Sequence, residues 1–139
     1  MLLALLAGCA YYLQASQTND ERASAAEINL AGRRRMLSQR IGLLASQLQL
    51  NPRPADVADL EHSAREMAEI HRLLLDGTPD RRIRPLPDSL RSAFDAPDGP
   101  HAKIAHFLNL ANSLQTLPTD SEAFRNTLEE VVSLGRAMC

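Results

Sequence analysis

The stretch from Ile28 to Ile41 holds the residues of this sequence best suited to bind a charged ligand. It contains four arginines and no acidic residue, although the chain of 139 residues has a net charge of −2. A guanidinium group presents forked N–H donors that match a carboxylate or another oxyanion. The stretch therefore predicts either an anion-binding surface or a basic face exposed to solvent. The four arginines are Arg33, Arg34, Arg35 and Arg40.

The elements that carry these arginines are expected to be helices. Aromatic residues make up only 4% of the chain and β-branched residues are sparse, which favours helix over strand. Apolar residues recur at steps of three and four in four segments, and each segment has one apolar stripe. We therefore predict an all-α fold, an antiparallel four-helix bundle whose stripes form the core. The predicted helices cover about residues 17–50, 54–75, 101–117 and 119 onward.

A proline- and glycine-rich segment, residues 77–100, separates the second predicted helix from the third. We expect a long ordered loop there, with one short helical turn at 88–94. A capping box formed by Thr119, Asp120, Ser121 and Glu122 should open the last helix. The apolar stripe of this last helix continues to Met138, next to the final residue of the sequence. We therefore expect the chain to be either a fragment of a longer protein or a stand-alone protein.

Residues 1–14 form an apolar leader that differs from the rest of the chain. It supplies about half of the roughly 20 residues that a spanning helix needs, and no Lys or Arg precedes it. We expect an export signal or the end of a truncated transmembrane segment. Leu6-Ala7-Gly8-Cys9 also resembles a lipobox, in which Cys9 would be lipidated. These alternatives place the chain outside the cytoplasmic membrane; an apolar start to a cytosolic helix would not.

The first predicted helix should have two opposite faces. At about 100° per residue, Leu30, Leu37, Ile41, Leu44 and Leu48 fall on one side and form the core stripe. The opposite side, centred near Ile28, carries what we call the glycine face, which consists of Gly32, Arg35, Gln39, Gly42 and Ser46. Arg33, Arg34 and Arg40 flank the core stripe, where we expect them to snorkel or to pair with acids on neighbouring helices.

Small residues on one helix face suit close approach of another backbone, such as the same helix in a second subunit. Glycine inside a helix costs about 1 kcal/mol against alanine, so two on one face suggest a packing role. A symmetric dimer through this face would bring two copies of Arg35 near the axis, where an anion would remove their repulsion. The alternative is that Arg35 is solvated and the glycines are merely tolerated.

The same stretch resembles the signature of the PilJ/NarX-like sensory domains, found in nitrate/nitrite sensor kinases and in type IV pilus chemotaxis transducers. The matching residues are Ile28, Asn29, Ala31, Gly32, Arg35, Met36, Ser38 and Arg40. The resemblance implies a periplasmic four-helix domain, here residues 15–139, attached to the membrane through its N-terminal segment. It also implies a homodimer formed through the first helix, for signal transduction or chemotaxis.

The resemblance further implies that Arg35 binds a small anion such as nitrate or nitrite at the dimer interface. We expect Gly32, Met36 and Asn29 to line this ligand site, and Ile28, Gly32, Arg35, Gln39 and Gly42 to form the dimer interface. The sequence departs from the pattern at Arg34, where transducer-type members usually have Gln. We expect the extra charge to alter the anion preference.

Other functions have weaker support in the sequence. No catalytic motif, cofactor motif or metal-ligand spacing is present, so we expect no enzyme, no cofactor and no metal site. His62 and His71, like His101 and His106, fall on different helix faces and are expected to be ordinary surface or packing residues. Consecutive arginines that point three ways, with a negative net charge, argue against nucleic-acid binding. The remaining alternative is a lipid-anchored or periplasmic scaffold protein that binds no small ligand.

Overall fold

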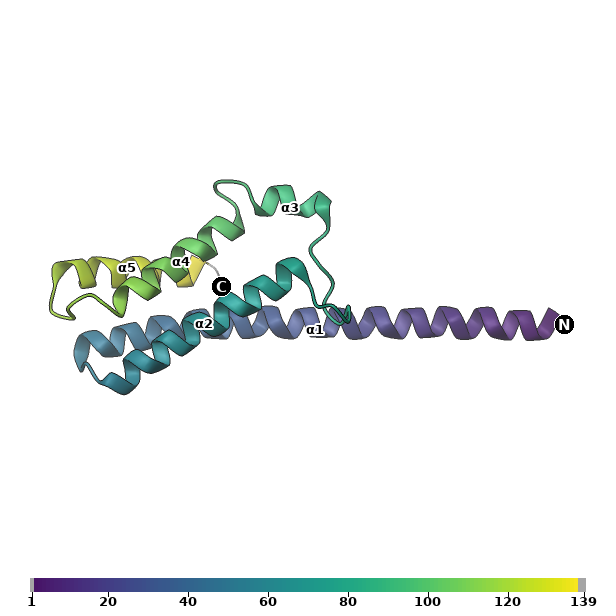
Figure 1. The fold of residues 1–139 in the computed structure, drawn as a ribbon, viewed down its shortest axis with the longest axis horizontal. Helices are drawn as coiled ribbons and strands as arrows, with labels where there is room; N and C mark the ends of the chain where they lie inside the picture. Colours follow the sequence, from purple (N-terminus) through teal and green to yellow (C-terminus); the bar gives the residue numbers. More distant parts are fainter. Residues whose placement is uncertain (1, 138–139) are drawn as a thin grey trace.

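The computed structural model describes residues 2–137, except for the side chains of residues 2–3, 5 and 16–24. This part of the chain is helical and contains no strand. Its helices are α1 (Leu2–Leu50), α2 (Pro54–Asp76), α3 (Asp88–Phe94), α4 (Pro100–Leu114) and α5 (Glu122–Ala137). Figure 1 shows α2, α4 and α5 gathered along the C-terminal half of α1, while the N-terminal half projects as a long rod.

Helix α1 is longer than the sequence predicted. We expected a helix from about residue 17, preceded by a separate leader, but one continuous helix runs from Leu2 to Leu50. The physical reason is that residues 9–31 contain no proline or glycine, so nothing in the sequence ends the helix between the leader and the arginine stretch. No helix in the described residues is long and apolar enough to span a membrane.

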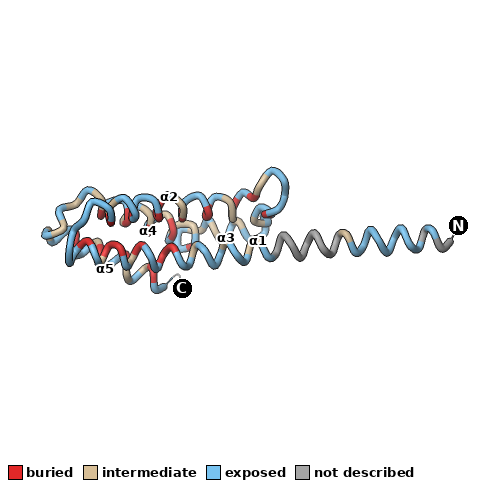
Figure 2. Tube along the Cα trace, turned by 90° about the horizontal axis from the view of Figure 1, so that it is seen from below, coloured by how far each residue is buried: buried red, intermediate tan, exposed pale blue. Residues whose placement is uncertain are grey.

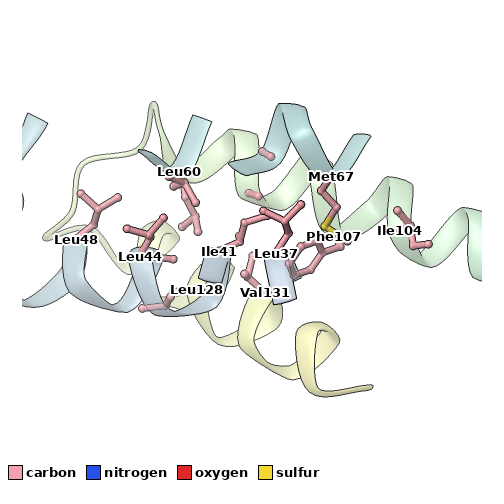
Figure 3. Packing of buried hydrophobic residues seen from close by; sticks show 14 of the residues in the cluster. Leu37, Ile41, Leu44, Leu48, Leu60, Met67, Ile104, Phe107, Leu128 and Val131 are labelled. Atoms are coloured by element: carbon pink, nitrogen blue, oxygen red, sulfur yellow. The ribbon is translucent and has the colours of Figure 1, made fainter. Parts of the chain in front are cut away.

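One hydrophobic core joins α1, α2, α4 and α5, and the predicted stripes form it. Leu37, Ile41 and Leu48 of α1 are almost fully buried, whereas Leu30 is only partly buried. Figure 3 shows Leu37, Ile41 and Leu48 packed with side chains of α2, α4 and α5, and Figure 2 shows that most buried residues lie where the helices run along one another. Met138, the last predicted member of the α5 stripe, lies outside the described residues. The other core residues include Leu60, Ala64, Met67, Ile70, Ile104, Phe107, Ala111, Leu114, Phe124, Leu128 and Val131.

The end of α2 requires its glycine. Gly77 follows the helix with φ 71°, a conformation that favours glycine. A Cβ at this position would lie 2.7 Å from both the Ile83 carbonyl oxygen and the Pro85 nitrogen. The chain can therefore leave α2 and turn back only with no side chain here.

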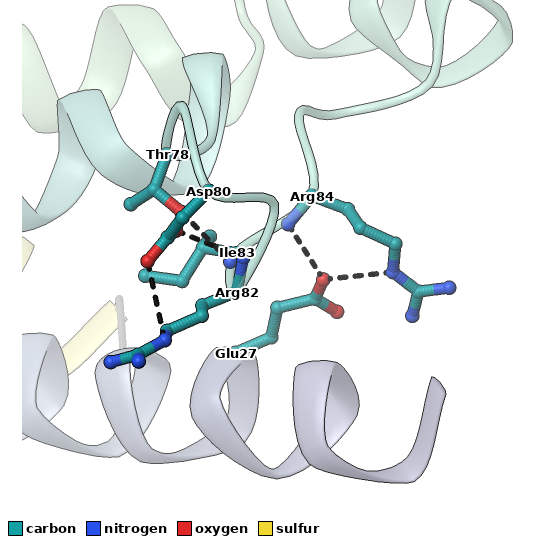
Figure 4. Close-up of polar contacts among 6 residues, drawn as sticks. All are labelled: Glu27, Thr78, Asp80, Arg82, Ile83 and Arg84. Atoms are coloured by element: carbon teal, nitrogen blue, oxygen red, sulfur yellow. Dashed lines mark hydrogen bonds and ion pairs between the residues drawn. The ribbon is translucent and has the colours of Figure 1, made fainter. Parts of the chain in front are cut away.

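The connection between α2 and α4 folds against α1. Its one helix, α3, occupies the residues where a short helical turn was predicted. Glu27 of α1 accepts hydrogen bonds from the backbone N–H of Arg84 at 3.2 Å and from its Nε at 3.3 Å (Figure 4). Within the loop, the Thr78 hydroxyl donates to Asp80 at 2.6 Å, and Ile83 is buried. The loop is thus anchored just before the arginine stretch of α1.

The start of α5 corrects the predicted capping box. The helix begins at Glu122, and the backbone N–H of Phe124 donates to the Ser121 hydroxyl at 3.1 Å. Ser121 is therefore the capping residue, two positions later than the box required, because the chain from Pro118 still turns through Thr119 and Asp120. Helix α4 also ends earlier than predicted, at Leu114 instead of Leu117.

Candidate functional site

The glycine face of α1 is open to solvent in the single chain. Gly32, Arg35 and Gln39 are exposed, while Gly42 and Ser46 are partly so. A Cβ at Gly32 or Gly42 would meet no atom within 4 Å outside the local helix. Packing within one chain therefore gives no reason for either glycine, and the face is free to approach another molecule.

The arginines of α1 fall into two groups according to their partners. Arg33 forms an ion pair with Glu66, and Arg40 lies 4.0 Å from Asp59, so both reach acids on α2 as predicted. Arg34 and Arg35 have no carboxylate partner among the residues whose side chains the structure describes. Arg35 is exposed, whereas Arg34 is partly buried, and this burial lowers the pKa of its guanidinium.

Exposed apolar side chains lie beside the glycine face. Ile28 is 70% exposed, Met36 54% and Leu43 60%, so three large apolar side chains on the outer side of α1 face water. Leu43 was missed as a site candidate. The signal was in the sequence, because Met36, Leu43 and Leu50 repeat every seven residues and so return to nearly the same side of a helix.

The predicted ligand residues do not all share one side of α1. Asn29 and Met36 are exposed, but they lie about 100° to 120° around the helix from Arg35. Gly32 lies one turn from Arg35 on the same face. In a single chain, Arg35 and Gly32 are therefore adjacent, while Asn29 and Met36 flank them. Cys9, the predicted lipidation residue, is exposed on the projecting half of α1.

A groove of about 380 Å³ continues the glycine face between α1 and α5. Gln39, Gly42 and Leu43 line it from α1, and Val131 and Val132 line it from α5. The hydroxyl of Ser46, also in the wall, donates to the Gly42 carbonyl at 2.8 Å. Ser38, whose hydroxyl donates to the Arg35 carbonyl at 2.7 Å, and the charged Arg136 also line this mainly apolar groove.

The structure brings together two histidines that the sequence analysis treated as unrelated. His71 of α2 is buried, and its Nε2 lies 2.8 Å from Nδ1 of His101 of α4. The two imidazole rings stack with their centroids 5.1 Å apart. The ring of Phe94, on α3, also stacks with His71, and the centroids of these two rings are 6.2 Å apart. Burial, together with the nearby His101 and Arg34, lowers the pKa of His71 to about 4. The ring is therefore neutral near pH 7.

No group of three or more His, Cys, Asp or Glu side chains suited to a metal occurs in the described part of the chain. A comparison with protein families identifies a family that matches this chain. The model of the PilJ family, described as the N-terminal region of type IV pili methyl-accepting chemotaxis transducers, matches residues 17–97, more than half of the chain. The chain belongs to the PilJ family. No curated protein and no solved structure matches it.

The PilJ match covers the part of the fold that carries the arginine stretch. It extends along α1 from residue 17, through α2, to just beyond α3. The whole glycine face and the loop that Glu27 anchors lie inside it, whereas α4 and α5 lie outside. The family is one of sensory domains and is not a family of enzymes.

Proposed function

We propose that this chain is an extracytoplasmic sensory domain that binds a small oxyanion, nitrate or nitrite, at a homodimer interface formed by α1. In this proposal, α1, α2, α4 and α5 form an antiparallel four-helix bundle with a proline-rich loop between α2 and α4. The observation that carries the proposal is Arg35, an exposed guanidinium without a carboxylate partner in the described residues, on a face whose glycines are open. Membership of the PilJ family supports the sensory role.

The dimer follows from the chemistry of this face. Two copies of α1 could approach closely at Gly32 and Gly42, because a Cβ at either position would meet no other part of its own chain within 4 Å. The exposed side chains of Met36 and Leu43 would be removed from water at the same time. Two Arg35 guanidinium groups would then face each other. A planar oxyanion between them would accept hydrogen bonds from the forked N–H donors of both groups. Ligand binding would thereby favour the dimer.

The proposed location is the periplasm, with the N-terminal end of α1 at the membrane. The support is the apolar composition of residues 2–13 and the sensory character of the PilJ family. In that arrangement the projecting half of α1 would link the ligand site to the membrane surface.

Calorimetry with nitrate tests the proposed function. We expect Arg35→Ala to weaken nitrate binding by at least about tenfold, because the charge-assisted hydrogen bonds of both copies are lost. Arg40→Ala is the matched control, since Arg40 lies on the same helix but approaches Asp59. We expect one nitrate per two chains in the unmodified protein. Equal nitrate affinity of the Arg35→Ala and unmodified proteins would refute the proposal.

A scaffold protein without a small ligand is the second candidate. The exposed row of Met36, Leu43 and Leu50 favours it, because such a row would also suit a helical envelope partner. This candidate predicts no thermal shift with nitrate or nitrite. It also predicts that recovery in the membrane fraction depends on Cys9.

A further inference from the structure

A second basic site lies inside the single chain, next to the groove on the glycine face; Ser38 lines both, and Arg35 borders the cavity as well as the glycine face. It is a cavity of about 220 Å³ where the arginine stretch of α1 meets the first turn of α4 and the end of α5. Arg34, Arg35 and Lys103 supply its charge. Met67, Ile104 and Ala137 supply its apolar wall. Two features of this cavity, its charge and its wall, indicate what it binds.

The three cations of this cavity form no ion pair within the described residues, as is also true of Arg81, Arg125 and Arg136, whereas eight other arginines of the chain do. Arg33, Arg40, Arg53, Arg65, Arg72, Arg82, Arg84 and Arg91 each lie within 4.0 Å of a carboxylate oxygen. Arg34, Arg35 and Lys103 form no such pair with any described side chain. Like charges gathered around one cavity repel each other, and an anion between them removes that cost.

Arg34 is the member of this group most in need of a counter-charge. It is partly buried, and removing an unpaired guanidinium from water is unfavourable. Its charge also reaches His71, where it contributes to lowering the pKa of the imidazole. The positive potential around Arg34 is therefore not neutralised by the protein itself. The first turn of α4, which has no side-chain cap, adds the positive end of a helix dipole.

The apolar wall distinguishes this cavity from a site for a simple inorganic ion. Met67 and Ile104 are core residues with only 1% and 3% of their surface exposed, and they line the cavity where it meets the core, while Pro100 and Ala137 add to its apolar lining. A ligand that fills this space must combine a negative head with a hydrocarbon portion, because each end then meets matching surface.

We propose that this cavity binds a small organic carboxylate, one per chain, with its head between Arg34 and Lys103 and its hydrocarbon portion against Met67 and Ile104. The inference goes beyond the proposed function, which places one inorganic oxyanion between two chains at Arg35. The organic carboxylate would contact helices α1, α2 and α4 of one chain at once. Its binding would therefore depend on how these helices pack together and not on dimer formation.

Calorimetry on the full chain with benzoate and butyrate tests the inference, with acetate as the probe that lacks a sizeable apolar part. We expect a ratio of one benzoate per chain, and at least about tenfold weaker binding in Arg34→Gln and in Lys103→Gln. Arg33→Gln is the matched control, because Arg33 is paired with Glu66. Ala137→Leu should also weaken benzoate binding, since it narrows the cavity without changing its charge.

Three results would overturn the inference. They are no binding of benzoate or butyrate, equal benzoate affinity in the Arg34→Gln and unmodified proteins, and acetate binding as tight as that of benzoate. Nitrate titrations of the same variants keep the two sites distinguishable. If Arg34→Gln loses benzoate but retains one nitrate per two chains, both proposals stand. If the unmodified protein binds benzoate but not nitrate, only the dimer site fails.

Discussion

At the scale of single residues, the surroundings of each basic side chain decide what it can do. Arg33 and Arg34 are neighbours in sequence, but one pairs with Glu66 while the other is partly buried without a carboxylate partner in the described residues. His71 illustrates the same rule for a weaker base. Its buried Nδ1 has no hydrogen-bond partner among the described residues, so the favoured tautomer carries its hydrogen on Nε2 and donates it to His101. Protonation would add an N–H group with no acceptor.

The buried histidine should make the stability of the protein depend on pH. The pKa of His71 is lowered from 6.5 to about 4 in the folded chain, so the unfolded chain binds more protons between these values. The free energy of unfolding should therefore fall as the pH decreases, by about 2 kcal/mol between about pH 7 and about pH 5 from this residue. Urea denaturation at the two pH values measures the effect.

The control for this prediction is His71→Leu, which removes the titrating group and keeps an apolar side chain beside Phe94. Its loss of stability over the same pH range should be smaller by about 2 kcal/mol. An identical loss in both proteins would show that His71 does not resist protonation in the folded state.

Part of the candidate site could be predicted at the residue scale, and part could not. The position of Arg35 opposite the core stripe follows from helical periodicity alone, and the structure leaves it exposed as expected. The contact between His71 and His101 depends on how α2 and α4 cross. The spacing of thirty residues between them carries no information about that crossing.

At the scale of elements, the spacing of apolar residues predicted most of the helices. The ends of the helices depended on which of several nearby residues capped or terminated each helix. Most residues of the predicted stripes of α1, α2, α4 and α5 are buried, whereas Leu30, Val57 and Leu74 are only partly buried. The cap of α5 was misplaced, because Thr119 and Ser121 are both suitable capping residues and only the path of the chain selects one. Helix α1 was predicted too short, because the change in composition after residue 14 is not a helix-ending signal.

Removal of the α5 cap should destabilise the protein by a measurable amount. Ser121→Ala leaves the backbone N–H of Phe124 without its acceptor and should lower the free energy of unfolding by about 1 kcal/mol. Thr119→Ala is the matched control, because Thr119 makes no side-chain hydrogen bond within the described residues. Chemical denaturation compares the two variants, and a larger effect at Thr119 would restore the capping box that the sequence predicted.

At the scale of the whole molecule, α1 both contributes to the core and presents an outer surface. Its inward stripe holds α2, α4 and α5 together, while its outer side presents glycines, Arg35 and exposed aliphatic residues. A helix that needs only its inner stripe for folding can change its outer side without loss of the fold. The two roles can therefore be separated by mutation.

Gly32→Leu should separate folding from dimer formation. The new Cβ would meet no atom within 4 Å beyond the local helix, and leucine favours helix more than glycine does, so the thermal stability of the monomer should not fall. The bulky residue should prevent close approach of two α1 helices, and the variant should sediment as a monomer while the unmodified protein sediments as a dimer. Ala58→Leu, at an exposed position of α2, is the control. A dimeric Gly32→Leu protein would place the interface elsewhere.

The uninterrupted hydrogen-bond ladder of α1 has a mechanical consequence. Arg35 and the first turn of α1 belong to the same 49-residue helix and are roughly 50 Å apart along its axis. A straight helix resists stretching and compression, so a small sliding or twisting displacement imposed near Arg35 would reach the far end almost undiminished. In this molecule, helix α1 itself would transmit such a displacement over that distance.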